Sequence, residues 1–87
     1  MNLRDYARGQ DCQVRLPGIC NFNHETTVLA HVRMNTGIGQ KAPDLMGAWA
    51  CSACHLAVDS DRSHRLDFIE GILRTQSILI ASGKVKW

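Results

Sequence analysis

The stretch Ala50-Cys51-Ser52-Ala53-Cys54-His55 decides the fold of this chain. Two cysteines separated by two residues lie on one tight turn, at the spacing that a tetrahedral zinc ion prefers. The histidine that follows offers a third ligand, directed elsewhere. One short segment therefore supplies both a structural metal clamp and a candidate reactive group.

A second pair of cysteines, Cys12 and Cys20, lies upstream with seven residues between its members. Four thiolates from two separate pairs would close a structural zinc site, and this set is the favoured one. The gap in the first pair is wider than the usual two to four residues. A mixed site in which His24 replaces one of these cysteines therefore stays open, as do disulfides or free thiols.

The length of 87 residues predicts one domain over residues 1–87, and such a chain buries only about 60–65% of its unfolded surface. So small a core needs a staple, which a metal or disulfides can supply. The N-terminus is too polar for a secretory signal, and no apolar run approaches the ~20 residues of a membrane span. We therefore expect a cytoplasmic protein without a membrane partner, where reduced thiols favour metal ligation.

The N-terminal two thirds is expected to form short elements. A Pro-Gly turn signal predicts an irregular β-hairpin between the first two cysteines, and a β-branched run predicts the next strand. In order, these elements are a solvated terminus or short helix (1–10), the hairpin (12–20), a strand (28–33), a glycine-rich loop (34–43) and a turn with a strand (44–50).

Two helices are expected to follow, over 52–59 and about 64–82, with Gly83 as the stop of the second. The predicted fold class is α+β, a small domain stapled by zinc. The core stripe of the second helix is predicted from apolar residues at helical spacing, with three more widening it. The stripe comprises Leu66, Ile69, Leu73 and Ile80, and the widening residues are Phe68, Ile72 and Leu79.

Two histidines remain if zinc takes the cysteines. His31 lies in the apolar strand, with Ala30 and Val32 facing the opposite way. His55 directly follows a zinc ligand, which fixes its position relative to the metal. Each alone could be a structural histidine or a spectator, but their joint placement favours a function.

A cysteine pair, a strand with a histidine, a loop and then Cys-x-x-Cys-His opening a helix resemble the HNH nucleases, whose ββα-metal fold often carries a bracing zinc. The shared motif spans about residues 12–59. In that family the strand histidine is the general base that activates water, and the histidine after the second cysteine binds the catalytic divalent ion. The resemblance gives these roles to His31 and His55.

The whole chain is more similar still to a small prophage-encoded family of proposed nucleases, the YbcO type. This resemblance implies a location in a bacterial or phage-infected cell. It rests on matches along nearly the full length: Arg8-Gly9, Cys12-Gln13-Val14-Arg15, Pro17-Gly18, Val28-Leu29-Ala30-His31, Pro43-Asp44-Leu45, Ala50 to His55, Asp59 and Arg74-Thr75-Gln76.

The chain departs from the wider HNH pattern at two positions. Ala30 stands where many members carry a metal ligand, and Met46 stands at the spacing of the central asparagine. Asp44 is the nearest polar candidate for a catalytic and metal-binding role. The other candidates for completing the metal site beside the second histidine are Asp59 and His64, or His31 itself.

The resulting function is a metal-dependent endonuclease that hydrolyses DNA. Histidine changes its charge near neutral pH and suits a general base, while Mg²⁺ or Mn²⁺ would stabilise the charge that develops on the phosphate. Basic side chains are expected to contact the nucleic-acid backbone, which positions the substrate without reading its sequence. They are Arg33, Lys41, Arg62 and Arg65.

A non-catalytic zinc module that binds nucleic acid or a protein remains the alternative. The enzyme needs a second, open metal position near the two histidines, and the module does not. Trp49 and Phe22 are expected to pack around the zinc or the core, with base stacking as the other interpretation. A thiol redox role is disfavoured because no βαβ pattern surrounds Cys51 and Cys54.

Overall fold

A computed structural model describes residues 3–32 and 43–85 of the chain. It is an α+β structure with a two-stranded antiparallel sheet, which confirms the predicted class at that level. In order, its elements are α1 (Leu3–Ala7), η1 (His24–Thr26), β1 (Val28–His31), η2 (Asp44–Met46), β2 (Gly47–Ala50), α2 (Ser52–Ser60), η3 (Arg62–His64) and α3 (Arg65–Ala81), where η marks a short 3-10 helix.

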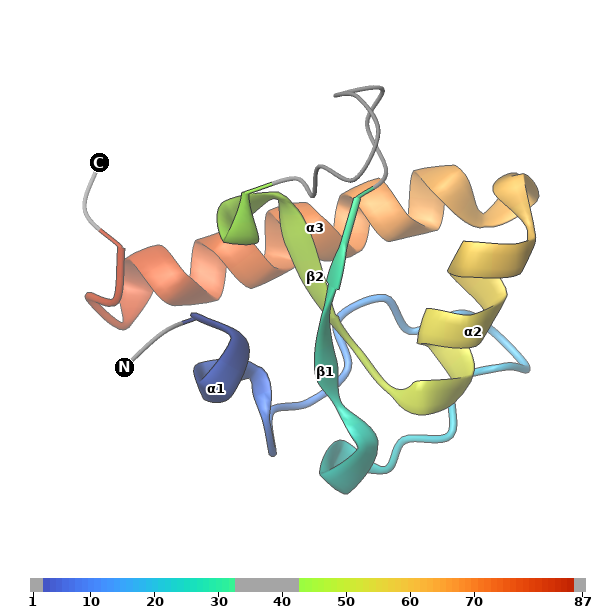
Figure 1. Ribbon diagram of the computed structural model, residues 1–87, viewed down its shortest axis with the longest axis horizontal. Coiled ribbons are helices and arrows are strands. Elements are labelled where there is room, and N and C mark those ends of the chain that lie inside the picture. The colour runs from blue at the N-terminus through green and yellow to red at the C-terminus, as the bar shows by residue number, and fades with distance from the viewer. Residues whose placement is uncertain (1–2, 33–42, 86–87) are drawn as a thin grey trace.

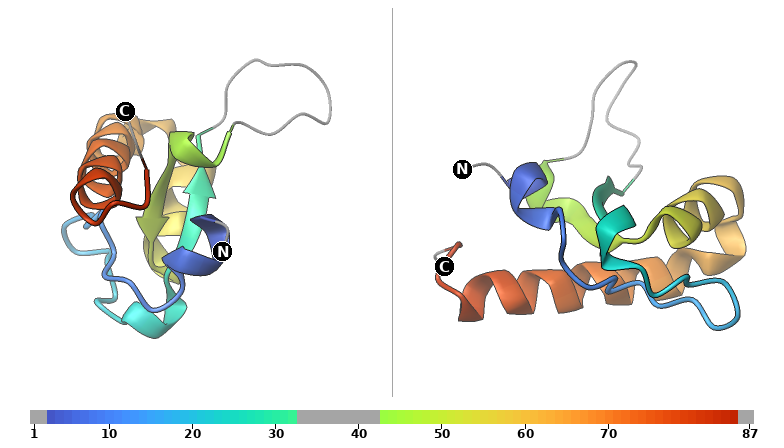
Figure 2. Two further views of the ribbon diagram at one scale, coloured as in Figure 1. Left: turned by 90° about the vertical axis from the view of Figure 1, so that its left-hand side faces the viewer. Right: turned by 90° about the horizontal axis from the view of Figure 1, so that it is seen from below.

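The two strands form the centre of the molecule. Val28 pairs with Ala50 and His31 with Gly47, and the Val32 N–H donates to the Met46 carbonyl at 2.9 Å, just beyond the strand. Figure 1 shows α3 running across behind the strands, with α1 and α2 on either side of them. The two further views in Figure 2 likewise show α3 along one side of the strands.

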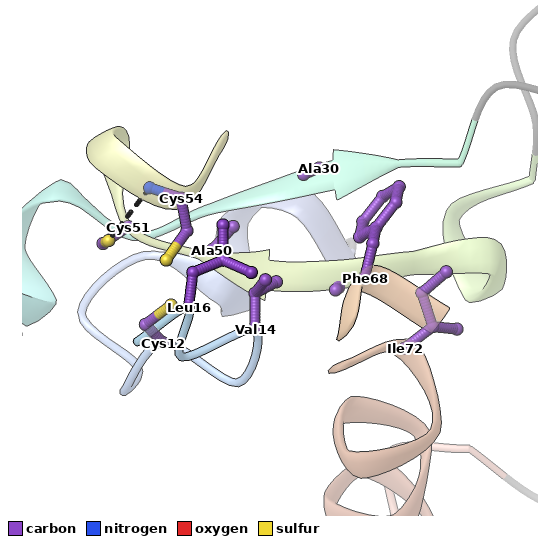
Figure 3. Close-up of a cluster of buried hydrophobic side chains, with 10 residues drawn as sticks. Cys12, Val14, Leu16, Ala30, Ala50, Cys51, Cys54, Phe68 and Ile72 are labelled. Carbon is purple, nitrogen blue, oxygen red and sulfur yellow. Dashed lines mark hydrogen bonds between the residues drawn. The ribbon is translucent and has the colours of Figure 1, made fainter. Parts of the chain in front are cut away.

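Alternation along the strands divides the buried side chains into two clusters. Ala30 and Ala50 belong to the cluster that includes Phe68 at the start of α3 and the cysteines at the start of α2, drawn in Figure 3. Leu29 and Trp49 belong to the other cluster, which includes α1 and the last turns of α3. The sheet therefore has an α2 face and an α1 face.

The helix α2 begins where the cysteine motif predicts. Cys51 is its N-cap, and the Cys54 N–H donates to the Cys51 sulfur at 3.4 Å. The sulfur thus satisfies one of the amide groups that a helix N-terminus leaves unpaired. The helix ends at Ser60, one residue beyond the predicted end.

The prediction for α3 is right for the three widening residues, Phe68, Ile72 and Leu79, which are buried, and wrong for the four-residue core stripe. Its four members are exposed, to fractions between 40% for Ile69 and 67% for Leu66. The buried face consists of Phe68, Gly71, Ile72, Thr75 and Leu79. This face includes a glycine and a threonine because both residues lie against the backbone of other segments there. A Cβ on Gly71 would lie 3.1 Å from the Val14 Cα, and the Trp49 N–H donates to the Thr75 hydroxyl at 3.0 Å.

The β-hairpin predicted over residues 12–20 is also wrong. The segment contains no strand and folds into turns, with the Cys20 N–H donating to the Leu16 carbonyl at 2.9 Å. Val14 and Leu16 are buried, and the Arg74 Nε donates to the Gln13 carbonyl at 2.8 Å. The segment has no strand pairing. Its buried side chains and this hydrogen bond to α3 fix its position instead.

Of the two alternatives predicted for residues 1–10, a solvated terminus or a short helix, the structure shows a short helix, and this helix is packed. Ala7 is fully buried, and the Tyr6 ring lies 5.9 Å from the Trp49 ring in an edge-to-face arrangement. Helix α1 therefore covers the face of the sheet that carries Leu29 and Trp49. No helix within residues 3–32 and 43–85 has the length and apolar character to cross a membrane.

Candidate functional site

Four cysteines gather near the start of α2 and form the candidate metal centre. The sulfur atoms of Cys12, Cys20, Cys51 and Cys54 all lie within 4.8 Å of one another, and none is in a disulfide. Figure 3 shows three of them together at one end of the core. The predicted four-cysteine set is therefore brought together, and His24 is not a member of it.

The geometry fits a tetrahedral metal ion with thiolate ligands. Sulfur atoms about 2.3 Å from a tetrahedral zinc ion are about 3.8 Å apart. The Sγ atoms of Cys20 and Cys51 are 3.8 Å apart. The cluster is therefore compatible with a structural zinc ion.

The electrostatics of the thiols also favour a bound cation. Burial raises the pKa of Cys54 and of Cys20. Burial opposes ionisation of Cys51 too, but the amide N–H groups of Cys54 and Asn21 donate to its sulfur and lower its pKa to about 7. Adjacent thiolates repel one another, so all four become charged only when a cation compensates them.

At the end of β1, His31 forms a pair with Asp44. The His31 Nε2 lies 2.7 Å from the Asp44 Oδ1, and the Arg4 Nε lies 3.8 Å from the other carboxylate oxygen. A carboxylate beside Nε2 favours the tautomer with the proton on that nitrogen. The lone pair is then on Nδ1, which can accept a proton from water.

Helices from both ends of the chain position this pair. Asp44 begins η2, and the Gln76 Nε2 of α3 donates to the carbonyl of the next residue, Leu45, at 2.6 Å. Arg4 reaches the same carboxylate from α1. Sequence reasoning missed Arg4 because it lay in an assumed solvated terminus. The four-residue spacing of Leu3 and Ala7, both packed in the α1 face, was the available signal for a helix.

A second histidine–carboxylate pair lies on α2. The His55 Nε2 is 3.4 Å from the Asp59 Oδ2, one helical turn further on. Both side chains are a little more than one third exposed. Residues four apart on a helix share one face, so a nitrogen and an oxygen ligand are presented together there.

Asp59 also lines a pocket of about 300 Å³ between the end of β1 and the start of α3. We call it the Asp59 pocket; its lining residues are Val32, Val58, Asp59, Arg62, Arg65 and Phe68. The pocket thus combines a predicted metal ligand with two of the four basic residues predicted to contact nucleic acid. The other two, Arg33 and Lys41, lie outside the described residues.

The two histidine–carboxylate pairs are separate. Alternation places His31 on the α1 face of the sheet, whereas Val32 lines the pocket on the α2 face. In the described part of the chain, only the cysteines form a group of three or more clustered metal ligands. His64 pairs with Asp61 at 3.7 Å.

Comparisons with known proteins agree over almost the full length. A family model described as "Putative nuclease YbcO" matches residues 1–84. "Putative nuclease YbcO" of Escherichia coli (strain K12) and "Putative nuclease ybcO" of Enterobacteria phage 82 are each 48% identical to this chain, over 98% of it and 97% of their own lengths.

A solved structure has a similar fold. It is described as "Structure of a putative bacteriophage protein from Escherichia coli str. K-12 substr. MG1655". It aligns with a TM-score of 0.81 and 43% sequence identity, over 94% of this chain and 100% of that one. The arrangement of helices and strands described above is therefore shared with an experimentally determined structure.

Proposed function

We propose, from the premise that the chain belongs to the YbcO family of nucleases, that it is a metal-dependent endonuclease that hydrolyses DNA phosphodiester bonds. We assign it to the HNH-like, ββα-metal type. The succession of β1, β2 and α2, with a cysteine pair at the start of the helix, supports this assignment. The ion proposed for the four cysteines is zinc, in a structural role.

The observation that carries the proposal is the 2.7 Å contact between the His31 Nε2 and the Asp44 Oδ1. A general base must keep its ring oriented and its acceptor nitrogen aimed at the water that attacks the phosphorus. Asp44 fixes the ring and stabilises the imidazolium that forms when Nδ1 takes the proton. In this proposal Asp44 therefore acts on His31 and is not a metal ligand.

His55 and Asp59 are the proposed ligands of the second ion. A nitrogen and a carboxylate oxygen suit Mn²⁺ or Mg²⁺, with the nitrogen favouring Mn²⁺. When bound, such an ion supplies Lewis-acid stabilisation of the phosphate and the leaving oxygen. Arg62 and Arg65, which line the same pocket, would bind neighbouring phosphates.

The end of β1 links these two groups of residues. His31 and Val32 are adjacent in the chain and lie on opposite faces of the strand, one beside Asp44 and the other in the Asp59 pocket. A DNA backbone laid across this strand end would meet the base on one side and the ligands and arginines on the other. Substrate and ion together would then complete the site.

The test uses purified protein with supercoiled plasmid and with branched DNA, each with added Mg²⁺ or Mn²⁺. We expect nicking by the parent chain and a loss of about 100-fold or more for His31→Ala, the size of a general-base contribution. Zinc content must remain equal in both proteins, so that a folding defect is not read as a catalytic one. Equal cleavage by the variant would overturn the assignment of His31.

Two observations favour the non-catalytic module. The His31–Asp44 pair lies on the α1 face of the sheet and Asp59 lines the pocket on the α2 face, whereas the enzyme needs its open metal position near both histidines. Within residues 3–32 and 43–85, no group of three clustered ligands accompanies the cysteine centre. An enzyme of the proposed type needs its third ligand from the substrate, from water or from outside these ranges. Plasmid and branched DNA that both stay intact with the parent chain and every added metal, while DNA still binds, would favour the module.

A further inference from the structure

A second pocket, of about 210 Å³, lies beside the cysteine centre and away from the proposed catalytic residues. Its lining residues are Asp11, Cys12, Arg15, Phe22 and His24, and we call it the Phe22 pocket. Cys12 belongs to the metal centre, and the other four side chains are exposed. Apart from Cys12, no part of this wall is used in the proposed hydrolysis.

Phe22 is the most exposed large apolar residue of the described chain, at 83%. The expectation that it packs around the zinc or the core is therefore wrong. A phenylalanine ring held in water forgoes the burial that normally stabilises it. Its ring is instead available for contact with a planar partner.

The backbone holds the ring in this position. Phe22 has φ = 55° and Arg15 has φ = 53°, and both residues line the pocket. Non-glycine residues adopt this left-handed conformation at a cost in energy, and such residues concentrate at binding sites. The two left-handed residues, Arg15 and Phe22, therefore both form part of the wall of the Phe22 pocket.

Hydrogen bonds on each side of Phe22 make the loop rigid. The Asn21 Nδ2 donates to the Ser52 hydroxyl at 3.1 Å, and the Asn23 N–H donates to the Asn21 Oδ1 at 2.9 Å. Thr26 joins the same network, since the Ser52 N–H donates to its hydroxyl at 3.1 Å. The loop is thereby fixed to the start of α2, and the ring is presented in advance of any contact.

Arg15 supplies a fixed positive charge at the pocket wall. Its Nε donates to the Cys12 carbonyl at 3.1 Å, and its Nη2 donates to the Gln13 Oε1 at 3.2 Å. These bonds use two of the five N–H donors of a guanidinium and orient the group. Asp11 is the acidic side chain of the wall, and it suits an N–H donor on a base edge, such as the N3–H of thymine, rather than a phosphate.

We propose that the Phe22 pocket binds an unstacked nucleobase of single-stranded DNA, with the base on the Phe22 ring and a flanking phosphate on Arg15. An exposed aromatic ring beside a guanidinium is the combination that single-strand binding uses, because every base has a π-face and a charged neighbour. Bases inside a duplex have both faces covered. The site would therefore select single strands, frayed ends or branches. As a statement about the substrate of the enzyme, this inference rests on the proposed function.

The test measures binding to a labelled oligo(dT) strand of about 12 nucleotides by fluorescence anisotropy, without added divalent cation. We expect Phe22→Ala to weaken binding about tenfold, and Phe22→Leu to weaken it similarly because leucine keeps apolar bulk but lacks a π-face. Phe22→Trp should retain the affinity. The matched control is Leu56→Ala, which removes another exposed apolar side chain, on α2 and outside the pocket.

A second readout separates stacking from charge. Arg15→Ala should weaken binding and reduce the slope of log affinity against log salt by about 0.7, the value for one phosphate on a single strand. Equal affinities of the parent and Phe22→Ala for the strand would overturn the proposed role of the Phe22 pocket. This result would leave the proposal of DNA hydrolysis untouched. Binding that depends on Phe22, together with plasmid and branched DNA that both stay intact, would instead support the pocket and overturn the proposed hydrolysis.

Discussion

The Sγ atoms of Cys20 and Cys51 lie 3.8 Å apart, although the two residues are 31 positions apart in the chain. Cys20 ends a segment without regular structure, and Cys51 is the N-cap of α2. An ion bound between them would tie the N-terminal loop to the helix. In so small a domain the free energy of metal binding becomes free energy of folding.

Cys20→Ser should therefore abolish stoichiometric zinc binding and the cooperative thermal unfolding transition. The variant loses one of four clustered ligands, and the remaining buried thiols lose their compensating cation. Elemental analysis and circular dichroism measure the two effects. His24→Ala is the matched control, because this histidine is outside the ligand group and the variant should keep its zinc. A Cys20→Ser protein with full zinc content would contradict the four-cysteine centre.

Zinc binding to the metal-free protein should release protons, and its apparent affinity should fall as the pH is lowered. Burial raises the pKa of Cys54 and Cys20, so these thiols hold protons at neutral pH that the metal must displace. Cys51, with a pKa of about 7, is half ionised there and releases a smaller share. Calorimetry in two buffers with different ionisation enthalpies counts the protons. Identical heats in both buffers would argue against thiolate ligation.

Asp44→Asn should lower the cleavage rate while leaving zinc content unchanged. An amide can hold the ring but stabilises the imidazolium less than a carboxylate does, so we expect a loss of about tenfold to 100-fold. The pair is partly exposed, with His31 at 20% and Asp44 at 34%, so stability should change little. Initial nicking rates at saturating metal give the result. Unaltered rates would remove Asp44 from the mechanism.

Asp59→Asn should raise the concentration of Mn²⁺ or Mg²⁺ that half-maximal cleavage requires, with a smaller effect at saturation. The substitution removes the charge of the proposed oxygen ligand, which lies 3.4 Å from the His55 Nε2. Metal titrations of the nicking rate measure the shift. Asp67→Asn on α3 removes an acidic side chain that does not line the pocket and should leave the titration unchanged. Superimposable titrations for the parent and Asp59→Asn would exclude it as a ligand.

Thr75→Val should destabilise the fold by about 1–3 kcal/mol, the cost of leaving a buried donor unpaired. The Thr75 hydroxyl accepts from the Trp49 N–H at 3.0 Å and donates to the Gly71 carbonyl at 2.9 Å, and valine has the same shape without either bond. Urea denaturation of the zinc-loaded protein measures the change. Ser77→Ala, at an exposed position of the same helix, should stay within about 0.5 kcal/mol of the parent.

The sequence predicted local structure where residues a few positions apart in the chain determine it. Cys-x-x-Cys followed by histidine predicted the start of α2 and the metal centre, because a thiolate can cap a helix and bind an ion from the same turn. A strand over 28–33 and a turn with a strand over 44–50 were predicted from composition and turn residues, and the structure has strands at 28–31 and 47–50. These features depend on neighbours within a few residues, which a sequence displays directly.

The buried face of α3 and the pairing of His31 with Asp44 depended on tertiary contacts. Leu66 and Phe68 are equally apolar and belong to stripes of the same period, so periodicity could not choose between them. The close approach of Gly71 to Val14 decides which stripe is buried. Likewise, α1 and η2 bring Arg4 and Asp44 to His31.

The sequence by itself therefore determined which residues can bind metal and where the helix that carries two of them begins. Only the tertiary structure decided that His31 pairs with Asp44, whereas His55 and Asp59 are one turn apart on the same helix. The physical reason is the separation along the chain over which each interaction acts. Helix capping and the spacing of metal ligands involve residues within about one helical turn of each other. The orientation of a face and the pairing of side chains are set by packing between segments that the sequence does not order in space.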